Sequence, residues 1–506
     1  MAANATLVRP LPSLRRGRQL ALLFGAAIAA DLSASLFITH EQGQVARVFG
    51  VAAGIAVVFW FAMGTRSALV AFTASWGLLH SFLFSTSLDG SEGPQSVNLS
   101  RALGGAIVVG VGLGLLRLRL RGGRLSPPLV AALLFLVLYA CDAAISPLRS
   151  LGAGDAGRVA SGVFIGIAAF YVFDTRDRLL QLSRAAFLGG VAVAAMTVVQ
   201  YAITKVSPAA AHAIFGSHAF VYSADQSHSN HVARVAGALG GPGETAGFLV
   251  VTASFGLLRY ALLRDTARTR GIVAGVALMG AAIVSTLTRA STVAFLLLIL
   301  IFMVQRQVRS VSAAGLRMKI VVALGISVLV AVPVLGSKTL HTRLWDINPT
   351  TSGTGFAQGR GAIWHTEMKR WDGSNVPHLL FGHGAHTSEI PGPPFINGAP
   401  TLTSVQNLLL WLLVETGLIG TVLYIAFLIG AGRRYRAAAR WGRYEYAGQV
   451  GAVALAGLIA YQVQGMFELS PISPSHGLYF MLFIGATLRA CTAAPTTWRA
   501  ASAQTD

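Results

Sequence analysis

The sequence predicts an all-α polytopic membrane protein. Of its 506 residues 54% are hydrophobic and only 11% are charged, and the mean hydropathy is +0.63. A soluble protein of this length has too little polar surface to cover so many apolar side chains. Apolar runs long enough to cross a bilayer recur along the whole chain, and such runs span a bilayer as helices. A soluble globular class is therefore excluded.

Hydropathy predicts about 14 transmembrane helices, with a range of about 12–14 because some apolar runs are short. They cover roughly residues 19–39, 48–64, 68–86, 102–116, 125–145, 159–174, 185–204, 236–258, 271–288, 290–304, 320–337, 408–430, 447–468 and 477–490. Residues 1–18 form a cytoplasmic N-terminus, 19–493 one membrane domain, and 494–506 a cytoplasmic tail. The first apolar run is too long for a cleaved signal peptide, which favours a retained helix, although "AIAADLSA" keeps cleavage as an alternative.

The net charge of +20 is distributed as a membrane topology signal. Arginine clusters such as "RLRLRGGR" (117–124) and "RRYRAAARWGR" (433–443) all fall on the cytoplasmic side of the predicted helices. This is the positive-inside bias, so membrane lipids explain the basic residues and no nucleic acid partner is predicted. Cys141 and Cys491 fall near opposite faces of the membrane, which predicts no disulfide.

Two outer loops, 205–235 and 338–407, are much longer than the others. Loops of this length in a compact protein are usually functional or disordered. Every histidine except His80 falls in an outer segment, which is explained either by the polarity of loops in general or by a polar site that faces outward. The larger loop holds aromatic side chains that favour an ordered structure: Trp345, Trp364, Trp371 and Phe381.

Several polar residues lie in or beside apolar runs. Arg289 separates two spans with almost no loop between them; it either snorkels to the interface or forms a fixed cation for an anionic headgroup. Glu244 follows the glycine- and proline-rich stretch 240–243, which predicts a broken helix that lines a polar pocket, unless this carboxylate simply pairs with a nearby arginine.

The stretch "GRGAIWHTEMKRWDGSNVPHLLFGHGAH" (359–386) is basic and rich in histidine. The guanidinium group of Arg360 suits a phosphate because its donors are planar and bidentate. His383 and His386 flank Gly384, where glycine permits the close approach of a ligand. With His378 they could form a zinc site, but no acid or cysteine joins them at a fixed spacing, so no metal is predicted.

A further acid lies inside a predicted span, in "QNLLLWLLVETGLIGTVLY" (406–424). Asn407, Trp411 and Glu415 share one helical face. Glu415 is then about 12 Å deeper than Asn407, at about 1.5 Å per residue. An acid at that depth is either functional or part of a buried pair with a neighbouring helix.

These motifs resemble, in order and topology, the O-antigen ligase and O-antigen polymerase superfamily of bacterial membrane glycosyltransferases. The resemblance covers about residues 230–430 and is carried by "RVAGALGGPGETAGFL", "TLTRASTVAFLL", "GRGAIWHTEMKRW…PHLLFGHG" and "QNLLLWLLVETGLIGTVLY". It implies a C-type glycosyltransferase fold in the bacterial cytoplasmic membrane, with an active site that faces outward. It also implies a glycan donor linked to undecaprenyl diphosphate, and a lipid, glycan or protein acceptor.

The resemblance assigns the diphosphate to arginines that correspond to Arg234, Arg289 and Arg360 here. In the family a histidine commonly precedes the asparagine of the last motif and is proposed to activate the acceptor hydroxyl. This chain has Gln406 there, which cannot take a proton, so His383, His386 and Glu244 are alternatives for the role. Asn407 and Glu415 are expected to support the site. Fixed arginines replace a metal in such a reaction, and no cofactor is predicted.

Two other functions fit part of the pattern. Broken helices and membrane acids also occur in secondary transporters and flippases for lipid-linked or anionic substrates. The long aromatic and basic outer loop and the lack of an internal repeat argue against transport. A peptidoglycan polymerase of the shape-and-division type has a similar topology but lacks these motifs.

Overall fold

A computed structural model describes twelve stretches of the chain and two isolated residues, Val70 and Thr73. The stretches are 125–215, 220–223, 232–235, 237–239, 241–263, 266–307, 360–388, 390–391, 402–403, 407–440, 446–466 and 476–492. The predicted spans 19–39, 48–64, 102–116 and 320–337, and nearly all of 68–86, lie outside the described residues. The number of transmembrane helices therefore remains a prediction.

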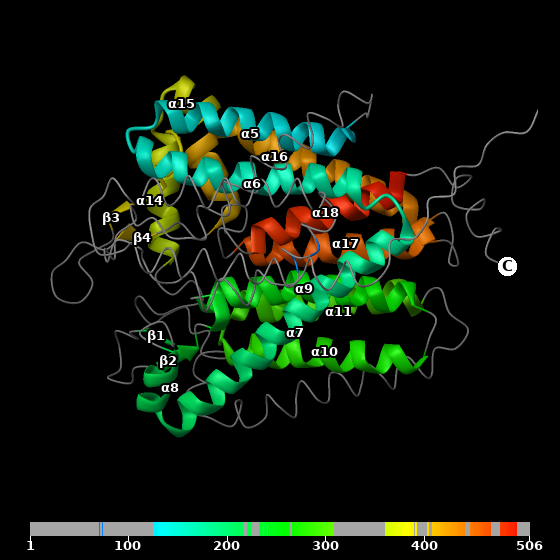
Figure 1. The fold of residues 1–506 in the computed structure, drawn as a ribbon. Helices are drawn as coiled ribbons and strands as arrows, with labels where there is room; N and C mark the ends of the chain where they lie inside the picture. The colour runs from blue at the N-terminus through cyan, green and yellow to red at the C-terminus, as the bar shows by residue number, and fades with distance from the viewer. Residues whose placement is uncertain are drawn as a thin grey trace, which may run out of the picture.

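The described part is helical, as predicted, with two small antiparallel strand pairs in its loops (Figure 1). The long helices are α5 (Pro127–Ile145), α6 (Arg149–Val172), α7 (Arg176–Val206), α9 (Pro242–Leu262), α10 (Thr266–Ser285), α11 (Arg289–Gln307), α16 (Leu408–Arg440), α17 (Tyr446–Gly465) and α18 (His476–Thr492). The shorter elements are α8 (Pro208–Phe215), β1 (Phe220–Ser223), β2 (Val232–Val235), η1 (Gly237–Leu239), α14 (Arg360–Asp372), α15 (Val376–Phe381), β3 (Ile390–Pro391) and β4 (Leu402–Thr403).

Within these stretches six helices are long and apolar enough to cross a membrane, namely α5, α6, α7, α9, α16 and α17. Large apolar side chains are exposed along their outer faces, for example Leu134 and Val137 on α5 and Leu188 and Val199 on α7. A soluble protein rarely exposes apolar surface over several whole helices, whereas a bilayer covers it. The chain is therefore a membrane protein.

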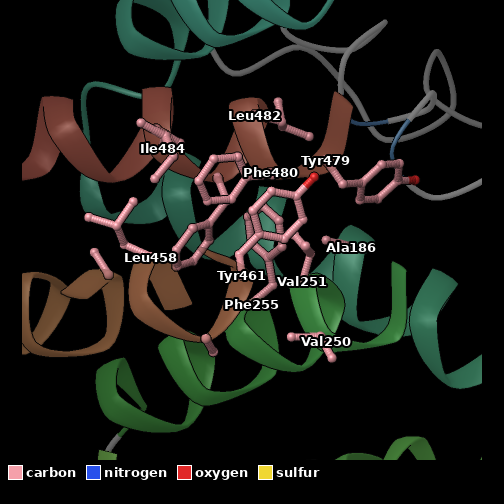
Figure 2. Packing of buried hydrophobic residues seen from close by; sticks show 14 of the residues in the cluster. Ala186, Val250, Val251, Phe255, Leu458, Tyr461, Tyr479, Phe480, Leu482 and Ile484 are labelled. Carbon is pink, nitrogen blue, oxygen red and sulfur yellow. The ribbon is translucent and has the colours of Figure 1, made fainter. Parts of the chain in front are cut away.

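The helices form two groups joined by a central pair (Figure 1). α5, α6 and α16 pack together on one side, and α7, α9, α10 and α11 on the other. The central pair, α17 and α18, contacts both groups. The core around this central pair is aromatic. The rings of Tyr461 and Phe480 stack with centroids 3.9 Å apart (Figure 2). Phe255 packs edge to face against Phe483, with ring centroids 5.0 Å apart.

Close helix packing depends on small residues, because apolar lipid leaves van der Waals contact as a main source of helix association. The α6–α18 contact is an example. A Cβ at Gly485 of α18 would collide with the carbonyl oxygen of Gly166 on α6. The two backbones therefore touch directly at this crossing, and only glycine permits it.

Several helix boundaries differ from the predicted ones, and three of them show the physical cause. The predicted span 236–258 begins as a helix only at Pro242, because proline fits the first helical turn and the segment before it forms the turn η1. α6 begins ten residues before the predicted span 159–174, and α16 continues ten beyond 408–430 into an arginine-rich segment. Hydropathy marks the apolar part of a helix, and its polar ends escape that signal.

The interrupted helix is α16. Gly417 has non-helical backbone angles inside it, with φ 62° and ψ −164°. Positive φ at this position favours glycine. The predicted break at 240–243 falls between the 3-10 turn η1 and α9, which begins at Pro242 after the extended backbone of Gly241.

Candidate active site

The polar residues of interest gather at one end of the bundle, at which α14, α15 and the two strand pairs lie (Figure 1). We call it the loop end. α5, α7, α10 and α17 end there, and α6, α9, α11, α16 and α18 begin there. Arginines cluster at the opposite end, where α7 begins and α16 ends: Arg176, Arg178, Arg433, Arg434, Arg436 and Arg440.

The turn 382–388, which contains the "GHGAH" motif, is held against the interruption of α16. The backbone amide of His383 donates to the carbonyl of Val414 (2.8 Å), and that of Gly384 to the carbonyl of Glu415 (3.2 Å). Gly382 and Gly384 have φ of 79° and 100°. A Cβ at Gly382 would collide with the Glu415 backbone. At Gly384, for which the sequence suggested the close approach of a ligand, a Cβ would lie 3.1 Å from the backbone of Ser146.

α5 and α6 hold the other side of the same turn. Ser146, which lies between these helices, donates from Oγ to the carbonyl of Ala385 (2.8 Å). Gly152 of α6 lies directly against Ala385, so a larger residue would push the turn away. From α14, Arg370 donates to the carbonyl of Thr387 (2.6 Å). The turn is thus fixed by contacts from four helices.

Glu415 is the buried anchor of this arrangement, with a relative exposure of 1%. Its Oε2 accepts from the hydroxyl of Tyr139 on α5 (2.9 Å). Its Oε1 accepts from the hydroxyl and the amide of Ser388 (2.5 and 3.3 Å). Of the two interpretations of this acid, the buried pairing is observed, with hydroxyl groups of α5 and of the turn as partners.

His386 forms a hydrogen bond with a residue far away in the sequence. Its Nδ1 lies 2.8 Å from Oδ2 of Asp155 on α6. The other carboxylate oxygen of Asp155 accepts from Arg158 (3.0 Å). His386 also has a left-handed backbone, with φ 66°. Such a conformation costs a non-glycine residue about 1–3 kcal/mol and is often found at functional sites.

His383 has different partners from His386. Its Nε2 lies 2.8 Å from the hydroxyl of Ser374, and its ring stacks on His378 with centroids 4.6 Å apart. Burial, and then the charges of Arg370 and His378, lower the pKa of His383 to about 4. The imidazole is therefore neutral at physiological pH. His383 and His386 thus contact different partners, Ser374 and Asp155.

α14 contributes a second buried acid. Glu367 is fully buried, and Arg370 one turn further along lies 3.8 Å from it. Burial raises the pKa of Glu367, and the positive charge of Arg370 opposes that rise. Arg370 thus serves this acid and the turn at once, whereas the sequence grouped it with the basic residues for phosphate.

A second acid–imidazole pair lies at the start of α9. Glu244, in the first turn of α9, has Oε2 3.6 Å from Nε2 of His476, the first residue of α18. Nδ1 of His476 lies 3.0 Å from the hydroxyl of Tyr461. The carboxylate of Glu244 therefore has a histidine among its partners, which the sequence did not suggest.

The three predicted diphosphate-binding arginines belong to elements of the loop end. Arg289 is the first residue of α11 and is half-buried. Arg234 lies in β2, opposite Val221, and Arg360 begins α14; the side chains of these two are outside the described structure. Whether the three form one cradle remains a prediction.

Gln406 lies outside the described residues, and Asn407 directly follows it. The side chain of Asn407 accepts from the amide of Leu410 (3.1 Å) and so caps the start of α16. This bond satisfies one of the helix's terminal amides. Asn407 therefore supports the site by fixing where α16 begins.

Sequence reasoning missed Tyr139, Asp155 and His476. Asp155 was placed in a loop before an apolar span, and Tyr139 and His476 carried no motif. The sequence did offer a signal at Asp142, because it is an acid inside a predicted span. In the structure Asp142 lies one turn from Tyr139 and is buried, with 2% exposure. It marks α5 as a helix that faces a polar centre.

The fold and these contacts define an integral membrane protein with a cluster of buried acids and imidazoles at one end of a helical bundle. Residues 274–425 match the family model described as O-antigen ligase. The match runs from α10 to the middle of α16 and includes the turn 382–388. This part of the chain is therefore similar to O-antigen ligases, in agreement with the resemblance of its motifs. A comparison with curated proteins gives no match.

Proposed function

We propose that this protein transfers a glycan from an undecaprenyl-diphosphate carrier to an acceptor at the outer face of the bacterial cytoplasmic membrane. The observation that carries the proposal is the O-antigen ligase match over 274–425. This segment contains Arg289, Arg360 and the turn 382–388, which is anchored on Glu415. The similarity to O-antigen ligases supports glycosyl transfer; the carrier, the acceptor class and the side of the membrane are our inference.

The chemistry needs two things from the protein. The donor already carries a good leaving group, so the first need is positive charge where negative charge develops on the diphosphate. Arg234, Arg289 and Arg360 are proposed to supply it, because guanidinium groups bind phosphate oxygens in pairs. The second need is a base for the acceptor hydroxyl. His383, His386 and Glu244 are the residues considered for that end of the reaction, and Gln406 occupies the position of the family histidine.

The distribution of charge supports an outward site. The arginine clusters lie at the end of the bundle opposite to the loop end. Arginine-rich segments stay in the cytoplasm during membrane insertion. The loop end then faces outward, where a flipped lipid-linked glycan and its acceptor are available.

The experiment uses purified full-length protein with a labelled undecaprenyl-diphosphate glycan and a hydroxyl acceptor. Transfer should release the carrier diphosphate and label the acceptor. Arg289→Ala and Arg360→Ala should abolish turnover while expression persists, and Lys at either position should rescue poorly because it lacks the planar pair of donors. Full activity of an Ala variant would remove that arginine from the site. Substrate that crosses a liposome membrane with no bond broken would favour a transporter or flippase instead.

A further inference from the structure

The loop end holds two acid–imidazole pairs that are oriented in opposite ways. In the Asp155–His386 pair the carboxylate is buried (4% side-chain exposure) and the imidazole is the more exposed partner (15%). In the Glu244–His476 pair the imidazole is buried (2%) and the carboxylate is exposed (35%). The first pair therefore presents a nitrogen base to the loop end, and the second presents a carboxylate.

The contacts of Asp155 fix the state of His386. An ionised carboxylate can only accept hydrogen bonds, so Nδ1 of His386 carries the proton in their 2.8 Å contact. The lone pair of the neutral ring is then on Nε2. Arg158 binds the other oxygen of Asp155 at 3.0 Å and keeps the carboxylate from turning. A buried carboxylate in this position also stabilises the imidazolium that forms when Nε2 takes a proton.

We propose that His386 is the general base for the acceptor hydroxyl and that Asp155 is the positioning residue that holds it in this role. The assignment rests on the proposed glycosyl transfer. The acceptor hydroxyl gives its proton to Nε2 of His386, and its oxygen forms a bond to the anomeric carbon of the donor. The bond from that carbon to the diphosphate oxygen breaks, and the electron pair leaves with the carrier diphosphate. The imidazolium then returns its proton to solvent.

Other candidates fit this role less well. Nε2 of His383 is bound to Ser374, and the low pKa of its ring, about 4, makes it a weak proton acceptor. Glu244 presents a carboxylate, which in water is a weaker base than imidazole by about two pKa units. Gln406, at the position of the family histidine, cannot accept a proton. Among the histidines whose side chains the structure describes, His386 is the one that a buried acid holds in the required tautomer.

The position of His386 in the fold suits the role. It lies in the turn 382–388, whose backbone is bonded to α16 and to Ser146. A base held this firmly keeps its geometry toward a bound hydroxyl, and orientation of this kind accounts for much of enzymatic rate enhancement. The chain thus replaces the family histidine with one from another segment of the same matched region.

The charged groups around the pair determine its response to pH. They are Asp155 and Arg158 of α6, Asp142 and Tyr139 of α5, Glu415 of α16 and Arg370 of α14. The acids favour imidazolium, and the arginines oppose it. Removing the charge of Asp155 should therefore weaken the base and move the acidic limb of the kcat/KM profile to lower pH while the rate falls.

The test compares variants chosen for the left-handed backbone at position 386. Asn and Gly both adopt positive φ readily, so His386→Asn and His386→Gly preserve the turn. Each should lower kcat about 10²–10⁴-fold with little change in KM for the donor. Added imidazole should restore activity to the Gly variant and not to the Asn variant. Asp155→Asn should lower kcat and shift the acidic limb. The control is His365→Asn, an exposed histidine of α14, which should behave as wild type.

The outcomes separate the two proposals. If wild-type protein transfers glycan and His386→Asn turns over at the wild-type rate, the assignment of His386 is wrong and the glycosyltransferase stands. Asp155→Asn could instead leave the pH profile unshifted and lower only the amount of folded protein on gel filtration. That result would show that Asp155 has a structural role and does not position His386. If wild-type protein transfers nothing, the proposed function fails and the assignment fails with it.

Discussion

Replacement of Glu415 tests the idea that this buried acid anchors the turn 382–388. The carboxylate accepts one hydrogen bond from Tyr139 and two from Ser388, and the backbone amide of His386 also donates to it. Glu415→Ala leaves these donors buried without an acceptor, at about 1–3 kcal/mol each. The hydroxyls can turn toward other acceptors and such costs do not add fully, so we expect a loss of about 2–5 kcal/mol.

Glu415→Gln is the informative comparison. Its amide oxygen can accept from both donors of Ser388, and its NH₂ group can donate to the hydroxyl of Tyr139. These three contacts are then satisfied, so we expect a loss of less than about 1 kcal/mol. If instead the charge is essential, the Gln variant should be as unstable as the Ala variant.

The assay is the midpoint of thermal unfolding of purified protein in detergent, together with limited proteolysis at the turn 382–388. The Ala variant should unfold at lower temperature and be cut faster there. Thr416→Ala is the matched control, because the buried Thr416 hydroxyl bonds only within its own helix, to the carbonyl of Leu412 (2.8 Å). Wild-type stability of Glu415→Ala, or equal damage from Thr416→Ala, would refute the anchoring role.

Three further predictions follow from the same contacts. His383 takes a proton near pH 6.5 in the unfolded chain but only near pH 4 in the folded protein, so the folded protein loses stability as the pH drops through this window. His383→Gln should reduce this loss in thermal unfolding scans. An identical pH dependence in the variant and the wild type would contradict the prediction. Gly485→Ala should lower the free energy of unfolding by about 1–3 kcal/mol, seen as a lower midpoint of thermal unfolding, because α6 leaves no space for a Cβ. Gly432→Ala is the control: its Cβ would meet only ordinary contacts, so it should be tolerated. EDTA should leave transfer unchanged if arginines stabilise the diphosphate, and a loss of activity that Mg²⁺ or Zn²⁺ restores would show that a metal takes part.

Much of the fold was predictable because it depends on hydropathy. Every predicted span that the described stretches cover is a helix, and an apolar run in a bilayer has no other way to satisfy its backbone. The boundaries were less predictable, since Pro242 begins α9 six residues later than expected and α16 extends beyond its apolar part. The break at Gly417 could not be predicted, because a glycine in an apolar run has the same hydropathy whether or not its backbone is helical.

The candidate site was predictable in its residue types and not in its pairings. The sequence drew attention to His386, Glu244 and Glu415 because polar groups beside apolar runs are costly. It could not indicate that His386 pairs with Asp155, 231 positions away, or Glu415 with Tyr139, 276 positions away. Such contacts depend on which helices lie side by side, and hydropathy contains no information about that.

By itself the sequence determined that this protein is a helical membrane protein, which end of its helices carries the cationic residues, and which family its motifs resemble. These properties follow from local composition and from the order of motifs along the chain. Only the tertiary structure decided that Gly382 accommodates the backbone of α16 and that Asp155 pairs with His386. The physical reason is that hydrogen bonds between helices require donor and acceptor atoms to be placed to within a few tenths of an ångström. The packing of the whole bundle determines that placement.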